Sequence, residues 1–370
     1  MRKILVLLAL VGLLVTGCGC TQAPILASPL PIASSTISAS TFTPTFTATP
    51  VPTASATPEL LPISVEAAAY LEDALDIMQQ KSLHRDRIDW GTLRKSAFKI
   101  AEHAQTPADT YGAIRYALAE LGDHHSHFLT PEEHTQRGQL TLKEIPAPRG
   151  KLLLGKLGFV AIEEFAGREG DEYATAAQQL IREIDTQQPC GWIVDLRENE
   201  GGGIGPMLAG LGPILGEGQV GASVDVDGNK QIWSYQDGQA SAAGEIFAQV
   251  HGPAYELKAA SPPVAVLTGM KTASAGEAIV VAFRGRPNTR SFGLYTAGVP
   301  TGNAGFILND GAMIALTVAV FADRTGQTYD DRIYPDEWVD EVQKLTIIMD
   351  EIIPKPAIDW LMSQPACSMQ

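Results

Sequence analysis

Two apolar runs that each lead through a turn of small residues into a helical stretch limit the fold of this chain more than any other feature. Cys190 to Leu196 is followed by Gly201 to Gly203 and then by a helical stretch near Pro206 to Leu215. Val264 to Leu267 leads in the same way into a helical stretch near Ala275 to Phe283. Strands that alternate with helices indicate an α/β fold, so we expect a core of strand-turn-helix units.

The residues before this core predict a small helical domain. Apolar residues recur at helical spacing in three segments: Ser64 to Leu83, Asp89 to Ala104 and Thr106 to Leu121. Gly122 has the position of a helix stop, so His125 should lie in a loop just past a helix end. We therefore expect the helical domain over residues 63–127 and the α/β core over residues 128–370.

Further patterns complete the predicted core. A strand is expected over Leu157 to Ile162 and an amphipathic helix over Asp171 to Ile184. Asp227-Gly228 and Asp310-Gly311 are turn sequences typical of hairpins. The apolar pattern from Leu345 to Met362 is interrupted by prolines and predicts two short helices.

The N-terminus carries a predicted export signal. Two basic residues precede an uncharged apolar run, Ile4 to Val15, that is shorter than the roughly 20 residues a membrane-spanning helix needs. The sequence Val15-Thr16-Gly17-Cys18 resembles the lipobox of bacterial lipoproteins. This resemblance implies a signal peptide over residues 1–17, a lipid on Cys18 and a location outside the cytoplasm, anchored to the cell membrane. An ordinary cleaved signal with an incidental cysteine is the alternative.

The segment after the signal, residues 18–62, is dominated by Thr, Ser, Pro and Ala. No charged residue occurs between Lys3 and Glu59. Such a segment buries too little apolar surface to offset the entropy lost on ordering. We expect a disordered, partly extended stalk that spaces the folded domain from the membrane.

Charge and cysteine content exclude some functions. The chain carries 27 Lys and Arg against 42 Asp and Glu, a net charge of −15. No stretch dense in Lys or Arg is present to neutralise phosphates, so we expect no nucleic-acid binding. The four cysteines, Cys18, Cys20, Cys190 and Cys367, form no CxxC pair. Their spacing gives no support to a metal-thiolate site or to a disulfide framework, so we expect cysteine to matter only at the N-terminus.

Both turns that follow the apolar runs contain residues suited to chemistry. In the run Asp195 to Gly203, the glycines allow backbone N–H groups to approach a ligand oxygen, as in an oxyanion site. The run lacks the lysine and the spacing of a P-loop. Ser274 lies at the start of a helix, where free N–H groups stabilise negative charge near its oxygen. Ser274 is a candidate nucleophile, and a helix N-cap paired with Glu277 in a capping box is the alternative.

Four of the seven histidines gather beyond the third predicted helix: His124, His125, His127 and His134. A serine nucleophile needs a base brought from elsewhere in the sequence, and a histidine of this group can supply it. Zinc binding is the competing interpretation, since imidazole is a common zinc ligand. The chain has no HExxH pair at this point, so we expect no metal and no other cofactor.

Three motifs follow one another along the chain: LGDHHS at Leu121 to Ser126, DLRENEGG at Asp195 to Gly202 and TASAGE at Thr272 to Glu277. They resemble motifs of the tail-specific or C-terminal-processing serine peptidases and their tricorn-core relatives. Ile333 to Asp336 also looks like a C-terminal element of that family. The resemblance covers Val65 to Asp336. It implies a crotonase-like α/β core with a small N-terminal helical domain, in which Ser274 hydrolyses peptide bonds.

The chain departs from many members of this family at two points. Val299 stands where they carry the lysine of a Ser/Lys dyad, and Lys271 is expected to face solvent. His125 matches the histidine of the tricorn-type Ser/His arrangement, so the resemblance implies a histidine base. The residues between His127 and Gly158 are too few for the PDZ domain of many members, because compact domains rarely have fewer than about 50 residues.

The leading hypothesis is an exported, membrane-tethered serine peptidase that acts on a peptide or protein substrate. Ser274 attacks the carbonyl carbon, and His125 accepts and returns the proton. The expected oxyanion donors are the backbone N–H groups of Gly201, Gly202 and Ala275.

Other interpretations stay open at this point. The acid that orients His125 is undecided, with Asp330 and Asp331 as candidates. A non-catalytic peptide-binding lipoprotein on the same fold is the alternative function, and a hydrogen bond between His125 and Ser274 would argue against it. A zinc hydrolase that uses His124, His125 and His127 is the third hypothesis. The oligomeric state does not follow from the sequence.

Overall fold

The computed structural model describes residues 61–137, 139, 146–340 and 344–368, which all belong to one compact unit spanning Glu59–Gln370. The predicted signal peptide, the lipid site at Cys18 and the stalk up to residue 60 lie outside the described residues. Among the residues described, no helix is both long enough and apolar enough to cross a membrane.

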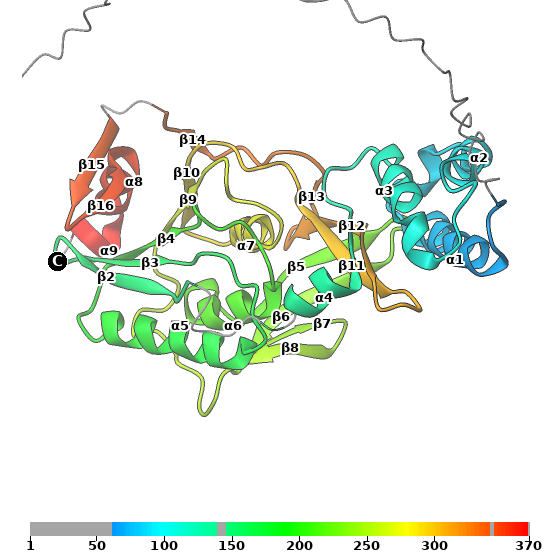
Figure 1. Ribbon diagram of the computed structural model, residues 1–370. Helices are drawn as coiled ribbons and strands as arrows, with labels where there is room; N and C mark the ends of the chain where they lie inside the picture. The colour runs from blue at the N-terminus through cyan, green and yellow to red at the C-terminus, as the bar shows by residue number, and fades with distance from the viewer. Residues whose placement is uncertain (1–60, 138, 140–145, 341–343, 369–370) are drawn as a thin grey trace, which may run out of the picture. The chain divides into compact units, whose positions relative to one another are not determined.

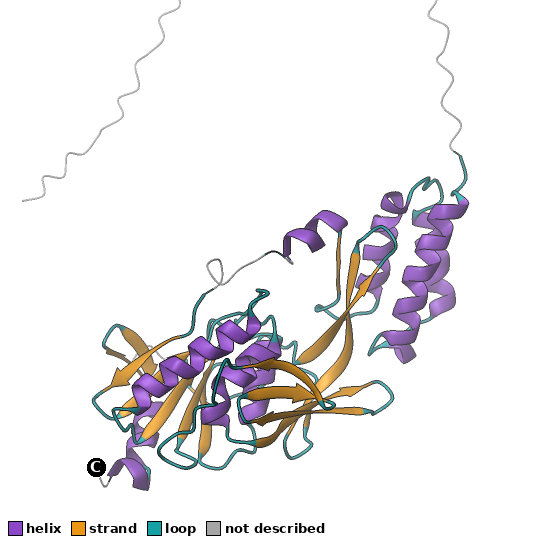
Figure 2. Cartoon of the chain, turned by 90° about the horizontal axis from the view of Figure 1, so that it is seen from below, coloured by secondary structure: helices purple, strands orange, loops and turns teal. Residues whose placement is uncertain are grey.

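Three helices open the described chain, as predicted. They are α1 (Val65–Lys81), α2 (Trp90–Ile100) and α3 (Tyr111–Glu120), with 3-10 turns at Arg85–Arg87 and Pro107–Thr110. Ser64 caps α1, because its Oγ accepts the N–H of Ala67. Asp89 caps α2 in the same way through the N–H of Thr92. Figure 2 shows the helices packed side by side, next to the end of a long hairpin.

The tip of that hairpin is anchored on the helices. β11 (Thr301–Ile307) and β12 (Met313–Asp323) pair antiparallel around the predicted Asp310-Gly311 turn. The carboxylate of Asp310 accepts the hydroxyls of Tyr70 in α1 and Tyr111 in α3. The apolar cluster beneath the helices also includes four buried residues of the hairpin: Leu308, Ala312, Ile314 and Leu316.

A six-stranded sheet crosses the core in the order β14, β10, β9, β4, β3, β2 (Figure 1). Its strands are β2 (Arg149–Leu153), β3 (Leu157–Ala161), β4 (Gly191–Asp195), β9 (Val264–Thr268), β10 (Thr289–Gly293) and β14 (Glu337–Trp338). All neighbours pair in parallel except β2 with β3. β3, β4 and β9 are buried along their whole length, because both faces of the sheet are covered.

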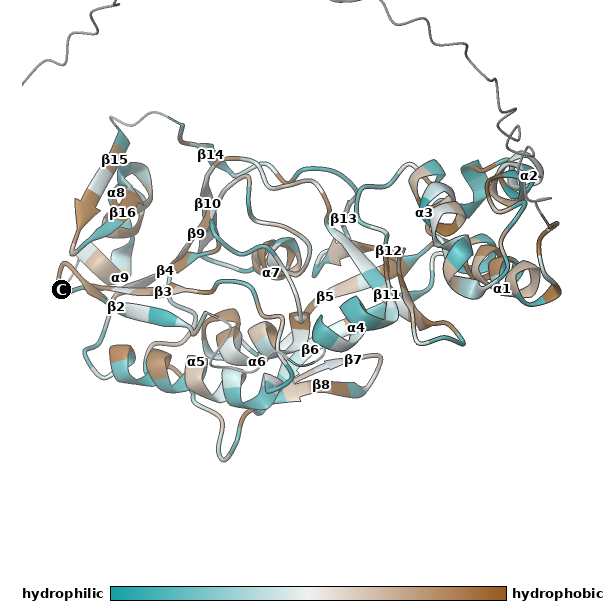
Figure 3. Ribbon diagram, viewed as in Figure 1, coloured by the Kyte–Doolittle hydropathy of each residue, from teal (hydrophilic) through white to brown (hydrophobic). Residues whose placement is uncertain are grey.

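Helices follow three of these strands and confirm the predicted strand-turn-helix units. They are α5 (Gly170–Asp185) after β3, α6 (Ile204–Leu215) after β4 and α7 (Ala275–Phe283) after β9. Every residue of α7 is buried, including Glu277, which is its one charged residue among apolar or small ones. Figure 3 shows teal and brown segments alternating along α5, as in a helix that buries one side. The predicted α/β fold class is confirmed.

A second, antiparallel sheet joins the core to the helices. Its strands are β1 (His127–Leu129), β5 (Gly218–Asp225), β6 (Lys230–Gln236), β7 (Gln239–Ala242), β8 (Glu245–Gln249) and β13 (Thr328–Tyr329), together with β11 and β12. The Asp227-Gly228 sequence forms the predicted turn between β5 and β6. β1 pairs with β12, with His127 opposite Ala315, and leads into α4 (Pro131–Arg137). This pairing brings the His125 loop next to β12.

The C-terminal prediction is wrong in its first half. Residues 345–354 form the hairpin β15 (Leu345–Ile348) and β16 (Glu351–Pro354), and only α8 (Lys355–Ser363) and α9 (Pro365–Ser368) are helical. Isoleucine occurs twice in each hairpin strand, and β-branched residues favour strands over helices. Pro356 fits the first turn of α8, where a missing N–H costs little.

A disulfide between Cys190 and Cys367 corrects the expectation for the cysteines. Their Cα atoms lie 4.9 Å apart although 177 positions separate them along the chain. The bond joins the residue before β4 to α9, within a buried apolar cluster. Cysteine spacing alone could not predict this pair, because the sheet and α9 bring the two residues together only in the folded chain.

Candidate functional site

The candidate site lies where three neighbouring parallel strands end. The turns after β4, β9 and β10 leave the same edge of the sheet, which is where α/β proteins commonly bind ligands. Backbone hydrogen bonds join the three turns: the N–H of Ala273 donates to the carbonyl of Asn199 at 2.9 Å, and the N–H of Ala297 donates to that of Thr272 at 2.9 Å. The sheet and these bonds therefore fix the turns relative to one another.

Ser274 has a strained backbone at the junction of its turn with α7. Its φ of 50° and ψ of −116° place a non-glycine residue in a region that costs about 1–3 kcal/mol. It occupies the N-cap position and forms a capping box with Glu277, as the capping alternative predicted. The residue is half-buried. A strained serine between a strand and a helix is typical of nucleophile turns.

Glu277 holds this turn and a second segment with one buried carboxylate. Oε2 accepts the N–H of Ser274 at 2.9 Å and that of Val299 at 3.0 Å. Oε1 accepts the N–H of Gly298 at 2.9 Å and the hydroxyl of Thr296. Burial raises the pKa of Glu277 above its ordinary value, although these donors favour the ionised form. Glu277 is thus a link between the serine turn and residues 296–299, rather than only a charge at a helix start.

The glycine run packs directly on the serine turn. Gly201 and Gly202 have φ values of 116° and 97°, which side chains rarely adopt. A Cβ on Gly201 would lie 2.9 Å from the Cβ of Ser274, and one on Gly202 would lie 1.9 Å from the carbonyl oxygen of Phe165. Both positions therefore require glycine.

The N–H groups of the expected oxyanion site differ in their availability. The N–H of Gly201 donates to Oδ1 of Asn199 at 3.0 Å, so this group is occupied, contrary to expectation. Within the described part of the chain, the N–H groups of Gly202 and Ala275 have no hydrogen-bond partner. Gly202 and Ala275 are the two predicted donors that keep a free N–H beside Ser274.

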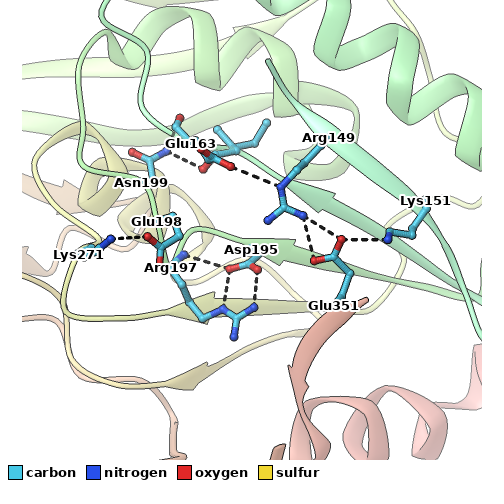
Figure 4. Close-up of polar contacts among 10 residues, drawn as sticks. Arg149, Lys151, Glu163, Asp195, Arg197, Glu198, Asn199, Lys271 and Glu351 are labelled. Carbon is cyan, nitrogen blue, oxygen red and sulfur yellow. Dashed lines mark hydrogen bonds and ion pairs between the residues drawn. The ribbon is translucent and has the colours of Figure 1, made fainter. Parts of the chain in front are cut away.

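Paired charges brace the segment before the glycines (Figure 4). Both carboxylate oxygens of Asp195 accept from the guanidinium of Arg197, at 2.9 and 2.6 Å. Glu198 binds the ammonium of Lys271 at 2.6 Å, and this bond raises the pKa of Lys271. Lys271 is exposed and protonated at neutral pH, so it is not suited to act as a base. Asn199 is fully buried and donates to the carbonyl of Ile162 at 3.0 Å.

His125 lies in the loop after α3, as predicted. Its backbone N–H donates to Oδ1 of Asp123 at 3.0 Å, and its carbonyl accepts from the amide of Asn303 at 2.9 Å. Its ring atom Nδ1 lies 2.7 Å from Oγ1 of Thr301, at the start of β11. Burial lowers the pKa of the imidazole, against the opposing effect of Asp123. The ring is therefore neutral at neutral pH, as a general base must be.

A cavity of about 470 Å³ opens beside His125. It is lined by parts of the helical segment, the β5–β6 turn and the β11–β12 hairpin: Leu83, His84, Arg87, Gly122, Asp123, His124, His125, Asp225, Val226, Val299, Thr301, Thr317, Val320 and Asp330. Ser274 is not part of this lining. The cavity therefore lies on the histidine side of the candidate site.

No hydrogen bond joins His125 to Ser274, although the structure describes both residues. They are connected instead through Glu277, which binds Ser274 and Val299, and through Thr301, two positions further on. Catalytic hydrogen bonds are often long in ligand-free structures and shorten when substrate binds. The catalytic pairing of Ser274 with His125 therefore stays a prediction.

The remaining predicted residues have other contacts. Asp330 lines the cavity and Asp331 is exposed, and neither binds a ring nitrogen of His125. The ring of His127 bonds to the carbonyl of His125, and that of His134 to Gly311. Among the described residues, no group of three or more His, Cys, Asp or Glu side chains is arranged to hold a metal ion. No local sequence pattern points to Thr301, because its contact with His125 spans 176 positions.

Comparison with known proteins agrees with the motifs. Residues 156–339 match the model of peptidase family S41. The chain is 28% identical over 298 residues to the nisin-resistance protein of Lactococcus lactis subsp. lactis. The aligned region covers 80% of this chain and 87% of that protein. It is 28% identical over 232 residues to the carboxyl-terminal-processing protease of Synechocystis sp., covering 62% of this chain and 46% of that protease.

A solved structure has the same fold. The structure of a lipoprotein from Streptococcus agalactiae superposes with a TM-score of 0.66 at 25% identity, covering 81% of this chain and 97% of that chain. The sequence prediction of a tail-specific peptidase family is confirmed by these matches.

Proposed function

The chain belongs to peptidase family S41 through residues 156–339, and we propose that it is an exported, membrane-tethered serine peptidase. Its substrate is a peptide or protein, Ser274 is its nucleophile and His125 is its general base. The observation that carries this proposal is the strained backbone of Ser274, at the point where its turn joins α7. Strain of this kind persists at functional sites, where the surrounding structure holds it.

The chemistry follows from the groups around Ser274. The hydroxyl oxygen attacks the carbonyl carbon of the peptide bond while Nε2 of His125 accepts its proton. The N–H groups of Gly202 and Ala275 stabilise the negative charge on the former carbonyl oxygen. His125 then gives the proton to the leaving amine. Water repeats the sequence on the acyl-enzyme, which releases the acid product and restores Ser274.

The proposed location rests on separate observations. The Cys190–Cys367 disulfide is of a kind that persists in oxidising compartments outside the cytoplasm. The similar lipoprotein from Streptococcus agalactiae agrees with an anchor at Cys18. We propose the corresponding organisation: a signal peptide over residues 1–17, a stalk over residues 18–62, and helical and peptidase parts over residues 63–127 and 128–370. Cell fractionation tests the anchor, because Cys18→Ala should release the protein from membranes.

Labelling with a fluorophosphonate probe tests the nucleophile. The wild type should label, Ser274→Ala should not, and His125→Ala should label at least about tenfold more slowly, because a positioned base contributes about 10²–10⁴-fold. Ser261→Ala is the matched control, since Ser261 also has a positive φ, of 51°, but lies outside the three turns. Equal labelling of Ser274→Ala would contradict the assignment.

The alternative is a non-catalytic peptide-binding lipoprotein on the same fold. The missing hydrogen bond between His125 and Ser274 is the observation that favours it. A wild-type protein that binds peptides but neither cleaves them nor reacts with the probe would establish this alternative.

A further inference from the structure

We propose that Thr301 is the positioning residue for His125, taking the place that an acid has in a Ser-His-acid triad. In this arrangement Nδ1–H of His125 donates to Oγ1 of Thr301. Nε2 then keeps its lone pair and can accept the proton of Ser274. This inference rests on the proposed function, since it assigns the partner that orients the proposed base.

The contact itself is close and enclosed. Nδ1 of His125 and Oγ1 of Thr301 are 2.7 Å apart, and Thr301 is only 8% exposed. Within the described residues, no carboxylate binds either ring nitrogen of His125. Asp123, the nearest in sequence, accepts the backbone N–H groups of His125 and Ser126 instead. The threonine hydroxyl is thus the group that holds the ring.

The hydrogen-bonding groups around the ring of His125 decide which of its tautomers is present. A neutral imidazole has one N–H and one bare nitrogen, and a hydroxyl can face either of them. Oγ1 of Thr301 has no other hydrogen-bond partner among the described residues, so it is free to accept from Nδ1–H. Only this tautomer leaves Nε2 as an acceptor for a serine proton. A hydroxyl also carries no charge, so it favours the protonated ring less than a carboxylate would.

Thr301 is itself held by the group that holds Ser274. Its N–H donates to the carbonyl of Val299 at 2.7 Å, and the N–H of Val299 donates to Glu277. Glu277 also accepts the N–H of Ser274. Thr301 in addition pairs with Val320 of β12. One buried carboxylate therefore fixes both the serine turn and the segment that positions the histidine.

Kinetics of peptide hydrolysis by the full chain test this role with two substitutions. Thr301→Val keeps the shape and removes the hydroxyl, and we expect kcat to fall about 10- to 100-fold with little change in KM. Thr301→Ser restores the hydroxyl and should keep kcat within about threefold of the wild type. Thr110→Val is the control, because Thr110 is also buried and its hydroxyl donates to the carbonyl of Pro107, away from His125.

A second measurement needs no activity. In protein labelled with ¹⁵N-histidine, the nitrogen shifts report which ring nitrogen is protonated, and His125→Gln identifies the His125 signals. Above the pKa of the ring, the wild type and Thr301→Ser should show Nδ1–H, and Thr301→Val should lose this preference. Thr110→Val should match the wild type.

The outcomes separate the two proposals. If Nδ1 carries the proton in the wild type and this preference is lost in Thr301→Val, the role of Thr301 is supported. If in addition no peptide or probe reacts with the wild type, the proposed function fails and the role of Thr301 stands. Nε2–H in the wild type overturns the role of Thr301 whether or not the protein is active. Equal kcat for Thr301→Val and the wild type also overturns it.

Discussion

Loss of the Cys190–Cys367 disulfide should destabilise the protein by several kcal/mol. The bond closes a loop across 177 positions, and the loop-closure entropy of a segment that long corresponds to about 5 kcal/mol at 25 °C. Because unfolded chains retain some structure, we expect a measured loss of about 2–5 kcal/mol in the free energy of unfolding. α8 and α9 should exchange their amide hydrogens first, since the disulfide joins this end of the chain to β4.

Urea unfolding with and without reductant measures this loss. At a slope of about 3 kcal/mol per molar, the midpoint should fall by about 1 M in the reduced protein. Cys190→Ala is the control, because its midpoint should be low and should not respond to reductant. The reasoning is refuted if oxidised and reduced wild type unfold at the same midpoint, or if Cys190 and Cys367 are alkylated without prior reduction.

Three more predictions concern the site. Gly202→Ala should abolish peptide hydrolysis and lower the free energy of unfolding by at least about 2 kcal/mol. Gly202 has a φ of 97°, and an added Cβ would clash with the carbonyl oxygen of Phe165. A variant with the activity and the urea midpoint of the wild type would contradict this. Glu277→Gln should lower kcat, and it should lower the free energy of unfolding by about 1–3 kcal/mol, because an amide nitrogen would face N–H donors that now bind the carboxylate. Peptide hydrolysis and urea unfolding test both effects. Activity should rise with pH as His125 loses its proton, with a midpoint below about 6.5 because burial lowers the pKa of the ring; a midpoint above 7 in kcat/KM would contradict this.

Helix α7, the glycine run and the His125 loop were predicted correctly, because short stretches of sequence determine them. α7 begins at Ala275 and ends at Phe283, as expected from a small-residue turn followed by an apolar run. The glycine run and the His125 loop also lie where their turn and stop residues indicated.

Contacts between distant parts of the chain could not be predicted in this way. The Thr301 contact and the disulfide span 176 and 177 positions. The occupied N–H of Gly201 depends on how Asn199 is buried, which no spacing reveals. The hairpin at residues 345–354 has apolar residues that fit a helical spacing, and pairing between β15 and β16 decides its structure instead.

The Asp310 anchor has a consequence for how this protein can be shortened. The three N-terminal helices complete their apolar interior with Leu308, Ile314 and Leu316, which belong to the hairpin. A fragment that starts at residue 128 would expose these side chains to water and leave Asp310 without Tyr70 and Tyr111. Exposed apolar patches of this kind promote aggregation. The helices are therefore not a detachable module, and a fragment made to express the peptidase part should also include the helical segment from Ser64 onward.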